Sequence, residues 1–127
     1  MNNQTAIEHY KREGYCVARQ LIPVHEIERI FSDMHGLVLQ QLKHYNVPQS
    51  GENTPQAVHS DLQALFKRDL KTYLATLTLS SKLTSLYELY LHANLRKFIA
   101  ELGLKIPVWQ TGPLLHLMSE ALKVPGG

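Results

Sequence analysis

The sequence has one cysteine, one tryptophan and no long run of apolar residues. The single Cys16 excludes a disulfide within the chain, so nothing favours an oxidising compartment. The first residues, MNNQTAIEHYKREG, lack the apolar core of a signal peptide, and no apolar run approaches the roughly 20 residues of a membrane helix. We therefore expect a soluble, cytoplasmic protein that has no membrane partner.

An excess of charge of one sign is also missing. The formal net charge is +2, with 13 Lys and Arg against 11 Asp and Glu. The densest basic pairs are at residues 67–68 and 96–97, and no basic stripe with interleaved aromatic residues occurs. The composition thus argues against nucleic acid as a partner. A length of 127 residues with 44% hydrophobic content fits one globular domain.

Helical periodicity is present over about the first hundred residues. A short helix is predicted to end at Gly14, and Pro23 is predicted to stand in the first turn of a second helix. The apolar stripe of that second helix consists of Ile27, Ile30, Phe31, Met34, Leu37, Val38 and Leu42.

Residues 46–55 concentrate Pro, Gly, Asn and Ser, so they predict a loop. Helical patterning resumes at Leu62. Two more helices are predicted between residues 80 and 102, with Ser80 or Ser81 as the N-cap of the first and Gly103 as the stop of the second.

Three short stretches have the residue pattern typical of β-strands. They are residues 15–20, 106–110 and 114–118, the last two being apolar runs interrupted by Pro and Gly. Three separated short strands make a poor sheet alone, so we expect them to belong to a larger sheet whose other strands would follow residue 127. The sequence therefore predicts an α+β, helix-rich fold, with a helical body over about 1–103 and strands over about 104–127.

Two parts of the chain resemble the N-terminal portion of the phytanoyl-CoA dioxygenase family, a branch of the Fe(II)/2-oxoglutarate-dependent oxygenases. The first part carries Tyr10, Gly14, Tyr15, Val17, Leu21, Ile22 and Ile27. The second part comprises residues 107–110, residues 114–118 and the segment Lys123-Val124-Pro125-Gly126. The resemblance implies a helical layer and the first strands of a double-stranded β-helix (jelly-roll, cupin-like), and hence a single partial domain over 1–127.

The resemblance also implies what chemistry to expect. Family members hold iron with a His-x-Asp pair and a distal His, and an Arg binds the 2-oxoglutarate carboxylate. Two His and one carboxylate on one face leave positions open for cosubstrate and O₂. By the resemblance these residues would follow Gly127, so we assign this chain no catalytic residue and no metal ligand.

The parent enzyme would use Fe(II) and 2-oxoglutarate to hydroxylate a small organic substrate. We expect neither cofactor to bind this chain tightly, and we expect the 127-residue chain to be inactive alone. Its main partner would be the missing C-terminal jelly-roll half.

Two residues are candidates for the wall of the cosubstrate pocket, His116 and Lys123. His116 interrupts an apolar run and shares a strand face with Leu114 and Met118; the plainer interpretation is a hydrogen-bonded core histidine. Lys123 belongs to the segment that resembles Lys-x-Pro-Gly, and the plainer interpretation is a solvated lysine. The single Trp109 lines the same cavity or, as we prefer, is a core residue on a strand.

One His-x-Asp pair does occur in this chain, at His59 and Asp61, and His116 follows it. Because the pair opens a helical run, we expect Ser60 or Asp61 to be an N-cap, and metal binding by His59, Asp61 and His116 is the weaker hypothesis. The other histidines are expected at the surface or half-buried; they are His9, His25, His35, His44 and His92.

Two functions from different classes therefore remain open. The first is the N-terminal part of a phytanoyl-CoA dioxygenase-like oxygenase. The alternative is a stand-alone helical protein-interaction module without catalysis, in which exposed apolar strands form the docking surface.

Overall fold

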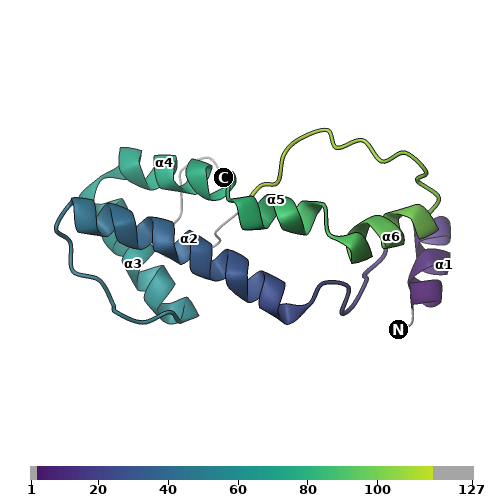
Figure 1. Ribbon diagram of the computed structural model, residues 1–127, viewed down its shortest axis with the longest axis horizontal. Helices are drawn as coiled ribbons and strands as arrows, with labels where there is room; N and C mark the ends of the chain where they lie inside the picture. The colour runs from purple at the N-terminus through teal and green to yellow at the C-terminus, as the bar shows by residue number, and fades with distance from the viewer. Residues whose placement is uncertain (1–2, 116–127) are drawn as a thin grey trace.

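The computed structural model describes residues 3–115 of the chain, and these residues form α-helices joined by loops. The helices are α1 (Asn3–Glu13), α2 (Val24–His44), α3 (Pro55–Arg68), α4 (Leu70–Ser80), α5 (Thr84–Tyr90) and α6 (Ala93–Glu101). Figure 1 shows an elongated molecule, with α3 and α4 at one end of α2 and with α1 and α6 at the other end. The predicted helical body is therefore present.

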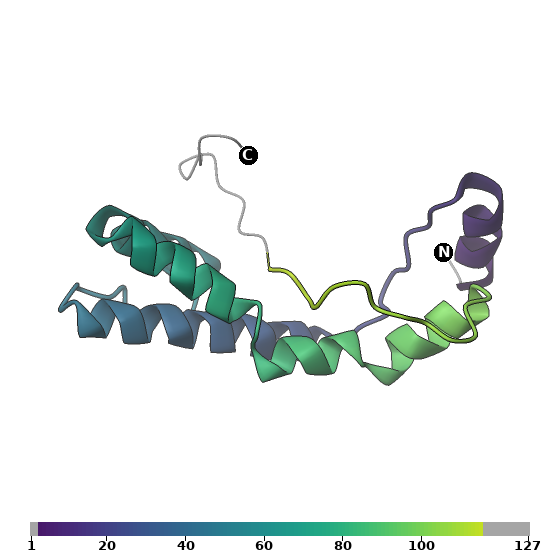
Figure 2. The ribbon, with the colours of Figure 1, turned by 90° about the horizontal axis from the view of Figure 1, so that it is seen from above.

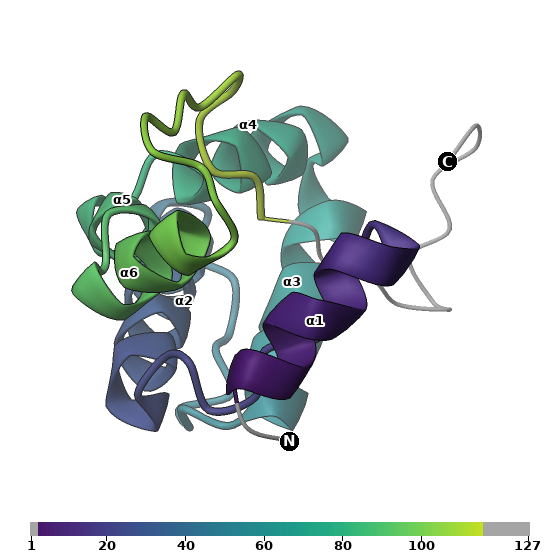
Figure 3. The ribbon, with the colours of Figure 1, turned by 90° about the vertical axis from the view of Figure 1, so that its right-hand side faces the viewer.

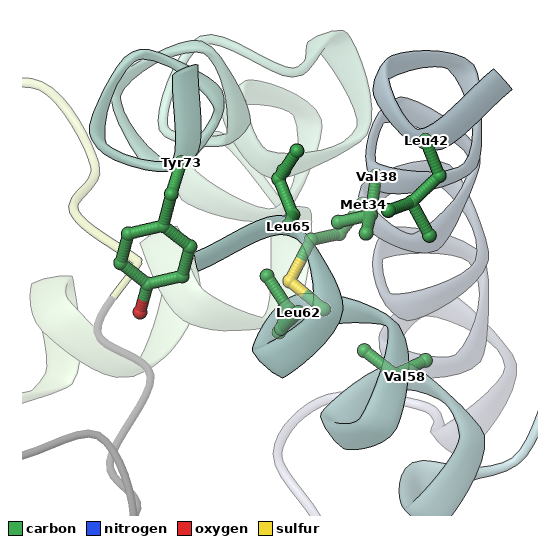
Figure 4. Packing of buried hydrophobic residues seen from close by; sticks show 7 residues of the cluster. All are labelled: Met34, Val38, Leu42, Val58, Leu62, Leu65 and Tyr73. Carbon is green, nitrogen blue, oxygen red and sulfur yellow. The ribbon is translucent and has the colours of Figure 1, made fainter. Parts of the chain in front are cut away.

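The main core lies between α2, α3 and α4. Its side chains come from Met34, Val38 and Leu42 of α2, from Val58, Leu62 and Leu65 of α3, and from Tyr73 of α4. Figure 4 shows these side chains meeting between the helices. Four members of the predicted stripe of α2 are buried (Ile30, Met34, Val38 and Leu42), whereas Ile27 remains 48% exposed. The three- and four-residue spacing thus identified the buried face of α2.

A second, smaller apolar cluster joins the N-terminal helix to the last one. Ala6 and Ile7 of α1 pack with Phe98 of α6, and the half-buried Cys16 and Leu21 pack against them. Figure 3 looks onto this end of the molecule, where α1 and α6 both face the viewer, side by side. The single cysteine is therefore part of an apolar contact.

The glycine stops of the helices are confirmed. Gly14 and Gly103 have φ of +81° and +101°, the left-handed conformation that glycine adopts without steric cost. The predicted N-caps are wrong. The N-cap of α3 is Thr54, whose hydroxyl oxygen accepts from the Ala57 N–H at 3.2 Å, and the N-cap of α5 is Leu83.

The predicted α+β class is wrong for the part of the chain described here, because residues 3–115 contain no strand. Residues 15–20 and 104–115 are irregular, with bends at several positions, and neither pairs with another segment as a strand. Figure 2 shows residues 104–115 running back along α6 and α5, where Tyr90 Oη donates to the Thr111 carbonyl at 2.9 Å. A strand needs a neighbouring strand for its backbone groups, and here a side chain takes that role. No jelly-roll strand is therefore present up to residue 115.

The helices also bear on the membrane prediction. None of the helices within residues 3–115 combines the length and the apolar character that crossing a bilayer requires.

Candidate functional site

A buried histidine and a buried aspartate form the most distinctive polar contact of the described chain. His35 of α2 and Asp61 of α3 are each only 2% exposed. The His35 Nε2 lies 2.9 Å from Asp61 Oδ2. The other ring nitrogen, Nδ1, lies 2.9 Å from Oδ1 of Asn53 in the loop before α3. A buried charge is tolerated when its polar atoms are paired in this way.

The same loop completes the environment of the Asp61 carboxylate. The Ser50 N–H donates to Asp61 Oδ1 at 2.9 Å, and the Ser50 hydroxyl donates to Asp61 Oδ2 at 2.8 Å. Burial acts to raise the pKa of Asp61, but the hydrogen bonds from His35 and Ser50 outweigh it and hold the pKa below its ordinary value of 3.8. Asp61 is therefore held as a carboxylate that joins α3, α2 and the loop over residues 46–54.

Ser50, Asp61 and His35 are the residue types of a hydrolase triad, but their order differs. In a triad the histidine contacts the serine hydroxyl and takes its proton. Here both the serine and the histidine contact the aspartate. The arrangement therefore does not activate Ser50 as a nucleophile. The arrangement instead holds two helices and a loop together by hydrogen bonds to one buried carboxylate.

The His59–Asp61 pair predicted from the sequence does not form one site. His59 is half-buried on α3, whereas the carboxylate oxygens of Asp61 are occupied by His35 and Ser50. Asp61 lies in the second turn of α3 and not at its start, so its predicted capping role is wrong. Residues 3–115 bring together no group of three or more His, Cys, Asp or Glu suited to a metal ion. The predicted pocket residues His116 and Lys123 lie outside the described residues.

The prediction for the remaining histidines is confirmed at four positions and wrong at one. His9, His25, His44 and His92 are exposed or half-buried, whereas His35 is buried. A signal for His35 was present in the sequence. It stands three residues before Val38 and seven before Leu42, and Asp61 stands three after Val58 and four before Leu65. Each polar residue thus falls within the apolar stripe of its helix.

Trp109 is neither a core residue nor part of a strand. Its side chain is 39% exposed and stacks on Tyr90 of α5, with the ring centroids 4.1 Å apart. Beyond it, a Cβ added at Gly112 would stand 3.1 Å from the hydroxyl of Tyr87, and the Leu115 N–H donates to the Ser81 hydroxyl at 3.3 Å. These contacts fix residues 109–115 against α5 and the end of α4.

Residues 104–115, which we call the apolar strap, expose large apolar side chains. Ile106 and Val108 are each 86% exposed, and Leu114 is 67% exposed. The strap also borders a mostly apolar groove of about 420 Å³, whose other wall includes Leu77 and Tyr87. Exposed apolar side chains beside an apolar groove make this region a candidate surface for binding.

Comparisons of the chain with protein-family models, with curated proteins and with solved structures found no match.

Proposed function

We propose that this chain supplies the N-terminal helical part of a non-haem Fe(II)/2-oxoglutarate-dependent dioxygenase of the phytanoyl-CoA dioxygenase type. In this role the helices are a scaffold, and the apolar strap is the surface on which the metal-binding part of the enzyme packs. The parent reaction is hydroxylation of a small organic substrate.

The row of exposed apolar side chains on the strap carries this proposal. Leu104, Ile106 and Val108 lie close together in the sequence and are 52%, 86% and 86% exposed. Covering one large apolar side chain contributes about 1.5–3 kcal/mol, so a partner that covers all three gains appreciable binding free energy.

The resemblance to the family supports the choice of partner. Gly14, Tyr15 and Val17 belong to the first family-like stretch, and the strap overlaps the second. Tyr15 and Val17 are 63% and 59% exposed, although the family phrase has apolar residues at both positions. Both stretches that carry the resemblance thus contain apolar side chains that lack cover within residues 3–115, such as Val17 and Val108.

Iron and 2-oxoglutarate are not assigned to the described residues. Those residues do not bring three metal-ligating side chains together, and the best-placed carboxylate, Asp61, is occupied by His35 and Ser50. We place both cofactors in the metal-binding part of the parent enzyme. His116 and Lys123 keep the role that the resemblance gives them, as candidates for the pocket wall.

The test begins with the complete reading frame of the native gene. We expect a His-x-Asp motif shortly after codon 127, and we expect the complete protein to convert 2-oxoglutarate to succinate in the presence of Fe(II). A stop codon directly after codon 127 would overturn the proposal and favour the alternative, a stand-alone interaction module. A complete protein that has the motif but neither binds Fe(II) nor consumes 2-oxoglutarate would also overturn it.

The scaffold role is tested separately with the two parts expressed apart. The 127-residue chain should co-purify with the remaining part of the enzyme. The double variant Ile106→Lys/Val108→Lys should lose this association, since lysine cannot be covered there without desolvation of its charge. Leu79→Lys is the matched control, because Leu79 is also exposed (47%) but lies on α4. Equal loss in both variants would exclude the strap as the contact surface.

A further inference from the structure

A second site lies at the opposite end of the molecule from the main core. It is a pocket of about 160 Å³ between residues 19–21 and α6. Its polar lining includes Arg19, Gln20, Asn94 and Lys97, and Phe98 forms an apolar wall. The pocket is distinct from the His35–Asp61 contact and from the apolar strap, and it does not depend on the function proposed above.

The walls of this pocket are fixed to one another. The Asn94 side-chain N–H donates to the Leu21 carbonyl at 3.0 Å, which joins α6 to a segment 73 residues away in the sequence. Leu21 and Phe98 also meet in the smaller apolar cluster. Between them the chain turns through Gln20, whose φ of +54° is rarely adopted by residues other than glycine. The segment that carries Arg19 is thus held beside the face of α6 that carries Lys97.

The pocket gathers positive charge that has no counterpart in the described structure. No ion pair, side-chain hydrogen bond or ring contact of residues 3–115 involves Arg19 or Lys97. Some other cations do have a partner: Arg29 pairs with Glu26 and Glu88, and Arg68 lies over the ring of Tyr45. The one acid that lines the pocket, Glu101, makes no ion pair with Lys97 although it follows one helical turn later. The lining therefore carries two positive charges and one negative charge.

We propose that this pocket binds a small oxyanion, a phosphate or a carboxylate, through Arg19 and Lys97. A guanidinium binds two oxygens of such a group at once, and an ammonium adds a third charge-assisted hydrogen bond. The amides of Gln20 and Asn94 supply further donors. The pocket of about 160 Å³ has room for a phosphate or a small carboxylate.

The experiment is a titration of the ¹⁵N-labelled 127-residue chain, followed by its amide resonances. Inorganic phosphate and acetate are added in separate series, with sodium chloride adjusted to keep the ionic strength constant. We expect saturable shifts at Gln20 and Asn94 in at least one series. Arg19→Ala and Lys97→Ala should each raise the Kd about tenfold or more, the usual effect of losing a charge-assisted hydrogen bond. Glu101→Gln should lower the Kd, because it removes the repelling charge.

The control is Arg96→Ala, which removes an exposed cation of α6 that does not line the pocket. It should leave the Kd unchanged, and thermal melting of each variant checks that the fold is retained. Shifts that rise linearly without saturation in both series would overturn the proposal. An equal loss of affinity in Arg96→Ala and Lys97→Ala would also overturn it, because it would show attraction to net charge alone.

Discussion

The His35 Nε2 lies 2.9 Å from the Asp61 Oδ2, although the two residues are 26 positions apart in the sequence. Both side chains are buried, and the contact joins α2 to α3. Ser50 and Asn53 extend it into the loop between these helices. The contact therefore makes a polar cross-link beside the main apolar core.

Removing one partner of this cross-link should be strongly destabilising. Asp61→Ala leaves the ring of His35 and the donors of Ser50 without their acceptor, and such a loss from a buried pair costs about 3–5 kcal/mol. The free energy of unfolding, measured by urea denaturation, should fall by about this amount. Asp33→Asn on the exposed face of α2 is the control and should change it by less than about 0.5 kcal/mol.

Replacing both partners should cost less than replacing one. In His35→Leu/Asp61→Leu the unpaired ring of His35 is gone and apolar side chains fill the site, so only the donors of the exposed Ser50 lose their acceptor. The double variant should therefore be more stable in urea than Asp61→Ala. If the double variant were the less stable of the two, the hydrogen-bonded pair would stabilise the fold more than the apolar side chains that replace it.

The stability should depend on pH through Asp61. Its pKa is lower in the folded protein than its ordinary value of 3.8, so the folded state favours the carboxylate. This contribution is fully present well above that ordinary value. It declines as the pH falls below about 4 and is lost below the folded pKa. The difference in unfolding free energy between wild type and Asp61→Asn should therefore narrow from pH 5 to pH 3. A difference that stayed constant over this range would contradict the assignment.

The main core should respond to truncation in proportion to burial. Leu65 is fully buried, whereas Leu74 on α4 is 45% exposed. Leu65→Ala should lower the free energy of unfolding by about 2–5 kcal/mol, because it removes buried surface and leaves a cavity. Leu74→Ala should have a much smaller effect. Similar losses at the two positions, measured by urea denaturation, would mean that Leu74 is covered in solution.

The position of the apolar strap can be followed through the single tryptophan of the chain. Tyr90→Ala removes the ring on which Trp109 stacks and the hydroxyl that donates to Thr111. We expect the fluorescence of Trp109 to shift to longer wavelength and to become more accessible to acrylamide. Tyr15→Ala, an exposed aromatic position elsewhere, should leave both properties unchanged. An unshifted spectrum in Tyr90→Ala would indicate that other contacts suffice to hold the strap.

Much of the helical body could be predicted from local sequence. Apolar residues, among them Met34, Val38 and Leu42, recur along α2 at steps of three and four. This face of α2 is therefore expected to be buried, whichever helices pack on it. Gly14 and Gly103 end their helices because a left-handed residue is needed there. The loop over residues 46–54 was also predictable, since its Pro, Gly, Asn and Ser residues disfavour a helix.

The N-caps were less predictable. Ser60, Asp61, Ser80 and Ser81 all have the side chains of good caps, yet Thr54 and Leu83 take the cap positions of α3 and α5. α3 begins seven residues before Leu62, where the apolar pattern resumes, because Pro55 fits its first turn and Thr54 satisfies a free N–H. Several residues near the start of each helix have side chains suited to an N-cap, and tertiary packing decides which of them is the N-cap.

Local sequence was thus enough to predict α1, α2, α5 and α6, the buried stripe of α2, and the glycines that follow α1 and α6, because these depend on neighbours three or four residues away. Only the tertiary structure decided that His35 pairs with Asp61, that Arg19 lies beside Lys97, and that residues 104–115 stack on Tyr90 without forming a strand. Each of these depends on a partner distant in the sequence. An apolar extended segment fits a sheet or a helix surface equally well until its neighbours are in place.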